Sequence, residues 1–557
     1  MAAAVMASGL AVAAAAPPQE EPAQEPFAME RVGEAQNVRE LDPLDSGQDR
    51  PVERVLETGE ELGDFSNPPL QGEELAQAEY DLAADLAAGR VEKDQSFDPR
   101  TSDKVASATT AQAEVFDNGN GTRTAVLGAG PERFKDATGD WVDFDLTPKA
   151  SADGSYRATA SDLDVSVPAD PEADGLVVMS RAEEMVGFGV PSVLVAGFSA
   201  PRAESDALSP DGHVAVKDSA GTTAAITLTT SGFEQQVTVG SRAALQKDGY
   251  ELTVSLPEGW AVRQGDAGTN RVEFFNIAGE LVATFGSGVA WDSTGASLAL
   301  AQMSDAVIVL DRTDAGQAVV RVSVDGAWLD KAVFPVTIDP TFTYTITGDS
   351  TYADTFAQND LGTAQENALF VAAGSKTGGP SFSGTYMRFP LPAAVTGAPT
   401  PPDVLAGVVS AELKLRVYSY AACNAAPLYV QSIAGAWTPS TMTYASGMPT
   451  AHEVFPTASA TMSNTGCTEA WYSFFPRASL QAQYAGTIGN HGLMITPWLD
   501  TTADSRRLAR SAEYGSNAAQ LIVTYEWRPP TPTTIIGPAD DATVTTTRPT
   551  LSVGAVT

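Results

Sequence analysis

The sequence predicts an all-β protein made of antiparallel β-sandwiches. Apolar residues alternate with polar ones in short runs, as at Val320, Val322 and Val324, and side chains with this period share one face of a strand. Turn sequences such as Asp325-Gly326 separate the runs. Helical patterns do not alternate with the strands, which argues against a parallel βαβ fold. We therefore expect antiparallel sheets packed face to face.

The first part of the chain has the composition of an exported protein. Residues 1–16 form an apolar run that ends in alanines before Pro17, as in a signal peptide, although the usual positively charged start is missing. The run is too short to span a bilayer. We predict a secreted, extracellular protein with no membrane insertion, and a true signal-peptide start further upstream.

Residues 17–104 form an acidic leader that is predicted to be mostly disordered. From Pro17 to Asp103 there are 23 acidic and 7 basic residues, with few large apolar side chains. Such a segment buries too little apolar surface to offset its conformational entropy. Leu75, Leu82 and Leu86 have helical spacing and predict a short helix over 73–90. It is either a plain surface helix or a partner-binding one.

Residues 105–342 are predicted to form a β-rich domain, and residues 345–526 a jelly roll of about eight to ten strands. In the second domain Leu413, Leu415 and Val417 alternate with Lys414, Arg416 and Tyr418. One face of that strand therefore suits a core and the other suits water or ligand. Residues 527–557 hold a proline-rich linker and the opening strands of an immunoglobulin-like or fibronectin-like module, so downstream domains of a longer chain are expected.

The net charge and the absence of catalytic motifs argue against several classes of function. The chain has 557 residues, with 70 acidic against 33 basic, and a net charge of −37. A field of this sign repels nucleic acid and anionic lipid. The Gly-Ser-Gly at 286–288 has the wrong spacing for a nucleophile elbow, and metalloprotease and phosphate-loop motifs are missing. We predict that the chain is not an enzyme.

The two cysteines, Cys423 and Cys467, both lie in the second domain. An even pair in an exported domain predicts a disulfide. Two free buried thiols are the alternative.

Short segments of the second domain occur in a familiar order. They are 352–356 (YADTF), 361–363 (LGT), 369–374 (LFVAAG), 386–391 (YMRFPL), 409–415 (VSAELKL), 442–444 (MTY), 489–493 (GNHGL) and 521–525 (LIVTY). In this order they resemble the DNRLRE (disaggregatase-related) domain, also classed as family 96 of carbohydrate-binding modules. The resemblance implies a jelly roll that binds polysaccharide.

Short segments of the first domain also resemble a region of known proteins. Segments 139–146 (GDWVDFDL), 291–293 (WDS) and 334–340 (FPVTIDP) resemble the β-rich region that precedes DNRLRE modules in large actinobacterial surface proteins, including Rhs/YD-repeat proteins. No ligand follows from it. The alternative function is therefore a structural shell or adhesin portion of a longer Rhs/YD-repeat toxin.

Sugars are held by aromatic rings that stack on their apolar faces, with polar groups around the hydroxyls. The candidate rings are Tyr418, Tyr420, Trp437, Tyr444, Trp471, Tyr472 and Trp498. Tyr418 and Tyr420 are preferred because they are predicted to lie on the polar face. Trp437 is retained, with a core role as its alternative. Lys414 and Arg416 would bind a carboxylate of an acidic glycan, and a neutral glycan remains equally open. Arg388 would join them or form a structural ion pair.

Calcium is the one cofactor considered. Asp349 and Asp354 lie near the first strand of the second domain and Asp500 lies near a late strand, and these strands are often neighbours in jelly rolls. The alternative for Asp354 is a turn cap. Residues 117–121 (DNGNG) loosely resemble a calcium loop, but Asn-Gly pairs are ordinary hairpin turns.

Overall fold

The fold is described from a computed structural model of the chain. It describes residues 97–527 with gaps at 169–175, 182–183, 190–212, 217–221, 246, 268, 315, 345–352, 367, 377–381, 392–404, 424–425, 445–457, 463–465, 485–487 and 498–503, together with two short strands near the C-terminus. The predicted signal segment, nearly all of the acidic leader and the helix predicted at 73–90 lie outside the described residues.

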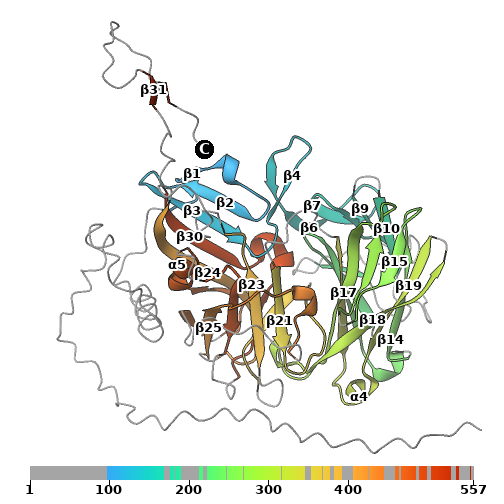
Figure 1. The fold of residues 1–557 in the computed structure, drawn as a ribbon. Coiled ribbons are helices and arrows are strands. Elements are labelled where there is room, and N and C mark those ends of the chain that lie inside the picture. Colours follow the sequence, from blue (N-terminus) through green and yellow to red (C-terminus); the bar gives the residue numbers. More distant parts are fainter. Residues whose placement is uncertain are drawn as a thin grey trace, which may run out of the picture. The chain divides into compact units, whose positions relative to one another are not determined.

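The described part of the chain is all-β, as predicted (Figure 1). Its two α-helices are short, α4 (Gly326–Leu329) and α5 (Arg477–Tyr484). Five 3-10 turns connect strands: η3 (Ala106–Ala108), η4 (Arg242–Ala244), η5 (Leu298–Leu300), η6 (Pro439–Thr441) and η7 (Ala512–Asn517). No helix of the described residues combines the length and apolarity needed to cross a membrane.

The largest sheet comes from the first predicted domain. Its main path, in spatial order, is β11 (His213–Val216), β12 (Thr222–Leu228), β13 (Gly232–Val239), β20 (Val336–Tyr344), β17 (Leu281–Trp291), β18 (Met303–Asp314), β19 (Gln317–Val324), β14 (Gly249–Ser255), β10 (Glu184–Gly189), β9 (Leu176–Arg181) and β8 (Asp164–Ser166). β16 (Val272–Phe275) joins β15 (Ala261–Gln264) to β17. Val320, Val322 and Val324 are all buried in its core, as their alternation predicts.

Two further sheets hold the strands of the second predicted domain, and one of them also includes strands from residues 103–128. An eight-stranded sheet has the order β1 (Asp103–Lys104), β2 (Ala113–Asp117), β3 (Thr122–Gly128), β30 (Gln520–Trp527), β24 (Leu405–Tyr420), β29 (Arg507–Arg510) and β22 (Phe370–Ala373), with β27 (Ala470–Phe474) also paired to β24. A five-stranded sheet has the order β21 (Ala353–Gln358), β23 (Ser383–Arg388), β28 (Leu493–Thr496), β25 (Ala426–Ser432) and β26 (Ala458–Met462).

The two sheets share one apolar core. Leu413 and Leu521 from the larger sheet and Met387 and Ile495 from the smaller one belong to a single buried cluster. Faces that meet in this way make a sandwich. The jelly-roll order of its connections stays a prediction.

Strand β3 pairs with β30 along seven residues, from Thr122 opposite Glu526 to Gly128 opposite Gln520. In Figure 1 the blue strands β1–β3 continue the sheet that contains the red strand β30. The sheet therefore crosses the domain boundary predicted at 342–345. The turn between β2 and β3 holds Gly119 and Gly121 at positive φ, 74° and 86°, and forms the hairpin that Asn-Gly pairs favour.

A partly buried loop joins the two predicted domains. The turn η5 comes from the first domain, and its carbonyl oxygens accept hydrogen bonds from two cations of the second. Arg506, which is fully buried, donates from Nε to Ala299 O at 2.6 Å and from Nη2 to Ala301 O at 2.9 Å. Lys376 Nζ donates to Leu300 O at 2.8 Å. Hydrogen-bonding both cations to backbone offsets the cost of removing their charges from water.

Three two-stranded sheets complete the described structure. They are β4 (Arg133–Lys135) with β5 (Trp141–Asp143), β6 (Asp145–Ala150) with β7 (Tyr156–Ala160), and β31 (Ile535–Gly537) with β32 (Ser552–Val553). The last pair lies in the segment for which the opening strands of another module are predicted.

Candidate functional site

The candidate site lies on the face of β24 that points away from the sandwich core. Leu413, Leu415 and Val417 are buried, whereas Lys414 and Arg416 are partly exposed. This is the alternation that the sequence predicts for a strand with one face in the core. The outer face of β24 therefore presents two cations side by side.

Strand β27 adds an exposed aromatic ring to these cations. It pairs antiparallel with β24 so that Trp471 lies opposite Arg416 and Ser473 lies opposite Lys414. Directly opposed residues share a face, and the Trp471 residue keeps 38% of its surface exposed. The centroid of its ring is 5.1 Å from Lys414 Nζ and 5.8 Å from Arg416 Cζ. We call Lys414, Arg416 and Trp471 the Trp471 platform.

Polar neighbours hold Arg416 in place. Its Nε lies 2.9 Å from Glu469 Oε1, and its Nη1 donates to Asn517 Oδ1. Arg510 shares the same Glu469 oxygen at 3.1 Å. Lys414 has no carboxylate partner in the described part of the chain. The platform thus combines one fixed guanidinium with one ammonium that is available to a ligand.

Tyr418 lies beside the platform but is engaged by the protein. The guanidinium of Arg510 lies between two rings, 4.5 Å from the centroid of Tyr418 and 4.2 Å from that of Tyr514. Burial raises the pKa of Tyr418 well above its usual value. Tyr418 therefore supports the sheet face rather than offering a free ring.

The exposure predicted for Tyr420 is wrong. Its pairing with β29 shifts register between Val417 and Ser419, and such an irregularity changes which side chains face the core. The residue is 2% exposed, and its hydroxyl donates to Thr468 O at 3.0 Å. Tyr420 is therefore a core residue and lies outside the reach of a surface ligand.

Trp437 takes its alternative role, that of a core residue. It is 7% exposed and packs in a small cluster with Tyr386 and Met442. Its Nε1 donates to His491 O at 2.6 Å. Of the other candidate rings, Tyr472 is partly buried, Tyr444 is 42% exposed and Trp498 lies outside the described residues.

The predicted calcium ligands are not brought together by the described structure. Asp349 and Asp500 lie outside it. Asp354 is 3% exposed, and its Oδ2 accepts a hydrogen bond from Ala512 N at 2.9 Å, at the start of η7. This is the capping role named as its alternative. Among the described residues, no group of three or more His, Cys, Asp or Glu side chains is arranged to hold a metal.

Asp354 belongs to a set of buried carboxyl groups near the junction of the two predicted domains. Glu234 and Asp339 come from the first domain, and Glu513 and Asp354 from the second. Burial raises the pKa of Asp339 and of Glu513 to about 7. Burial and, in second place, the neighbouring acid raise the pKa values of Glu234 and Asp354 well above their usual range. These groups therefore stay protonated in mildly acidic solution.

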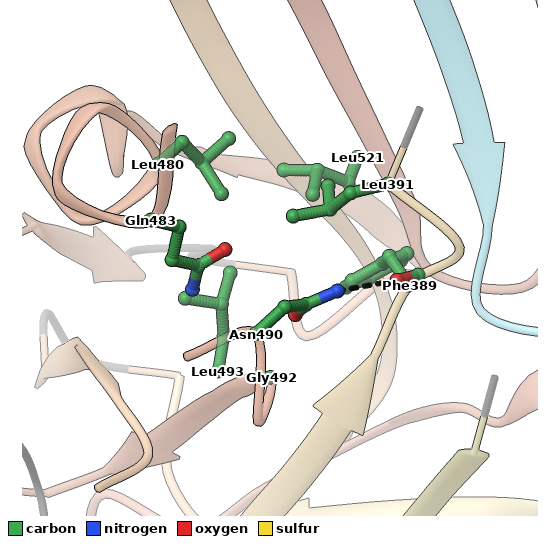
Figure 2. A pocket seen from close by; sticks show the side chains of 8 residues that line it. All are labelled: Phe389, Leu391, Leu480, Gln483, Asn490, Gly492, Leu493 and Leu521. Carbon is green, nitrogen blue, oxygen red and sulfur yellow. Dashed lines mark hydrogen bonds between the residues drawn. The ribbon is translucent and has the colours of Figure 1, made fainter. Parts of the chain in front are cut away.

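A small pocket lies under α5, away from the predicted sugar-binding residues. Figure 2 shows the amide of Gln483 among Leu480, Leu493 and Leu521, with Asn490 donating to Phe389 O at 3.3 Å. Both amide atoms of Gln483 are buried without a hydrogen-bond partner in the described part of the chain. None of the residues predicted to bind carbohydrate lines this pocket.

The predicted disulfide is present and braces the strand that carries Trp471. Cys423 follows β24 and Cys467 precedes β27, with their Cα atoms 5.2 Å apart and a sequence separation of 44. It thereby fixes β27 to its neighbour near the platform.

Removing the disulfide should destabilise the sandwich. A C423S/C467S double variant should lose roughly 3–4 kcal/mol of unfolding free energy, because the cross-link restricts the unfolded chain. Urea denaturation of both proteins measures the difference. Reduction of the wild-type protein should lower its stability by a similar amount, and equal midpoints with and without the bond would contradict the prediction.

No protein-family model matches this chain, and no curated protein matches its sequence. The resemblance to the DNRLRE domain therefore stays a prediction, and the function must be argued from the residues themselves.

Proposed function

We propose that this chain is a secreted, non-catalytic protein that binds polysaccharide at the Trp471 platform. One observation supports the proposal above the others: an exposed indole lies on a sheet face beside two cationic side chains of the neighbouring strand. Indole rings present an apolar face on which the C–H groups of a sugar ring can pack. The ammonium of Lys414 can donate to hydroxyl or carboxylate oxygens at the edge of that ring.

A platform of this kind binds weakly. A single ring with one or two charged neighbours covers only a small part of a polymer, so useful affinity would come from several modules acting together or from tethering to a surface. This suits a cell-wall or environmental polysaccharide, which presents many copies of the same unit.

Trp471→Ala tests the proposal. The full-length protein should be retained on at least one member of a panel of insoluble neutral and acidic polysaccharides. Trp471→Ala should weaken binding about tenfold or more, because an aromatic contact contributes about 1.5 kcal/mol beyond its buried area. Pull-down with quantified free protein measures the change.

The matched control is Ile277→Ala, which removes an apolar side chain that is 82% exposed in the first predicted domain. This variant should bind as the wild type does. Equal retention of wild type and Trp471→Ala would show that the platform is not the binding surface.

A structural role is the second candidate, as part of the shell of a longer surface protein of the Rhs/YD-repeat class. The sheet that crosses both predicted domains and the buried Arg506 contacts favour it, because they fix the two domains as one unit. If the folded protein is retained on no polysaccharide of the panel, this role is favoured over binding.

A further inference from the structure

The second sheet of the sandwich carries an arginine that the saccharide proposal does not use. Along β23 the side chain of Met387 points into the main core, whereas Tyr386 belongs to the small cluster around Trp437 on the opposite face. Because strand side chains alternate, Arg388 lies on the same outer face as Tyr386. The Trp471 platform, by contrast, is on the eight-stranded sheet.

Arg388 is held against an aromatic ring that is itself fixed. Its Cζ lies 5.2 Å from the centroid of Trp437. The hydrogen bond from Trp437 to His491 O and the burial of that ring keep the indole in one position. A guanidinium stacked on a fixed ring has a defined orientation, which lowers the entropy lost when its N–H groups bind a partner.

One hydrogen-bonding group of Arg388 lacks a partner in the described part of the chain. Its Nε is buried and has no acceptor, and no carboxylate is paired with it in the described part of the chain. Burial lowers the pKa of Arg388. Arg133, Arg271 and Arg416, by contrast, each pair with a carboxylate, and the more deeply buried Arg506 has a backbone carbonyl as the acceptor of its Nε.

This difference is unexpected in so acidic a chain. With 70 acidic residues available, pairing one with Arg388 would need a single substitution, and a buried unsatisfied donor is costly. A partly desolvated guanidinium without a counter-ion is complementary to an oxyanion, which accepts two of its parallel N–H groups at once.

We propose that Arg388 binds an oxyanion group of an external ligand, either a planar carboxylate or a tetrahedral sulfate or phosphate. Trp437 orients the guanidinium. The exposed ring of Tyr444 lies 6.1 Å, between ring centroids, from Phe382, which precedes β23, and would offer apolar surface to the uncharged part of a ligand that extends along the strand. The site is separate from the Trp471 platform and does not depend on it.

Titration of the full-length protein with small anions tests this site. Sodium acetate, sulfate and phosphate are each added at constant ionic strength, with chloride as the balancing ion, so that general screening does not change. The readouts are the arginine Nε–Hε resonance of Arg388 and tryptophan fluorescence. The wild type should show a saturable change with at least one anion, and the preferred anion identifies carboxylate or tetrahedral chemistry.

Two variants and a control make the result specific. Arg388→Gln should abolish the fluorescence change, and Arg388→Lys should weaken it about tenfold because the bidentate fork is lost. Arg312→Gln, at an exposed arginine paired with Asp311, should respond as the wild type does. The proposal is overturned if no anion gives a saturable change below about 100 mM, or if the response survives in a folded Arg388→Gln protein. Loss of polysaccharide binding in Trp471→Ala alone leaves these outcomes unchanged.

Discussion

Replacing Arg506 by methionine should lower the free energy of unfolding by about 3–5 kcal/mol, because Arg506 donates two short hydrogen bonds and a hydrogen bond that involves a charged group contributes about 1.5–3 kcal/mol. The methionine fills much of the same space but donates no hydrogen bonds. The carbonyl oxygen of Ala299 would then be buried without its donor, whereas Ala301 O keeps the hydrogen bond from Lys376 Nζ at 2.9 Å. A buried acceptor left without a partner costs about 1–3 kcal/mol.

The contacts of Arg506 also predict where the protein should loosen. Lys376 still reaches Leu300 and Ala301, so the turn η5 keeps one cation. We expect amide hydrogens of η5 and of β29 to exchange faster in the variant, while those in the centre of the large sheet stay protected. Urea denaturation measures the stability, and hydrogen exchange locates the change.

Arg312→Met is the matched control for Arg506→Met. Arg312 pairs with Asp311 at the surface, where its side chain is 57% exposed. Exposed ion pairs contribute little, so this variant should stay within about 0.5 kcal/mol of the wild type. Equal losses in the two variants would show that Arg506 does not join the two predicted domains in the way described.

Stability should fall as the pH rises from about 4 to 7, which is the second large effect. Burial raises the pKa of Asp339 and of Glu513 to about 7 in the folded protein, from ordinary values of 3.8 and 4.5. Between these limits the folded state binds more protons than the unfolded state. Each such group then lowers the free energy of unfolding by about 1.4 kcal/mol for every unit by which the pH rises. Their stabilising effect is complete below about pH 4 and is lost by about pH 7.

The other buried acids of the junction act in the same direction. The pKa values of Glu234 and Asp354 are raised further. The pKa of Asp292 is lowered, so its protonation changes the stability only below about pH 4, outside this pH range. Denaturation in urea at pH 5 and pH 7 should therefore show a loss of several kcal/mol between them.

Asp339→Asn should flatten this pH dependence because it removes one of the titrating groups. Asp311→Asn, a change at a partly exposed carboxylate, should leave the slope as it is in the wild type. A wild-type stability that rises between pH 5 and pH 7 would contradict the proton-binding argument.

Much of the fold could be predicted because it follows from local periodicity. The alternation of Val320, Val322 and Val324 and of Leu413, Leu415 and Val417 correctly identifies which side chains are buried. The disulfide could be predicted from the two cysteines, because a single pair of cysteines in an exported domain allows only one intramolecular bond.

Long-range pairing could not be predicted in this way. Nothing in the sequence near Thr122–Gly128 indicates that β3 pairs with β30, about 400 residues later. The contacts of Arg506 with η5 depend on the same kind of distant packing. Hydrophobic periodicity and turn residues identify each strand separately. The order of strands in a sheet depends on the whole chain.

The candidate site was predicted in part. Lys414 and Arg416 face outward as expected, but the register shift after Val417 turns Tyr420 into the core. Trp471 was one of seven candidate rings, and nothing local set it apart. Only its place opposite Arg416 on the edge strand β27 shows that it completes the platform.

The most direct test of the proposed binding site is a crystal structure of the protein with an oligosaccharide cut from a polysaccharide that retains it. We expect a sugar ring packed on the indole of Trp471, with a hydroxyl or carboxylate oxygen accepting a hydrogen bond from Lys414 Nζ. A well-ordered saccharide bound elsewhere, with Trp471 and Lys414 exposed to solvent, would contradict the proposal.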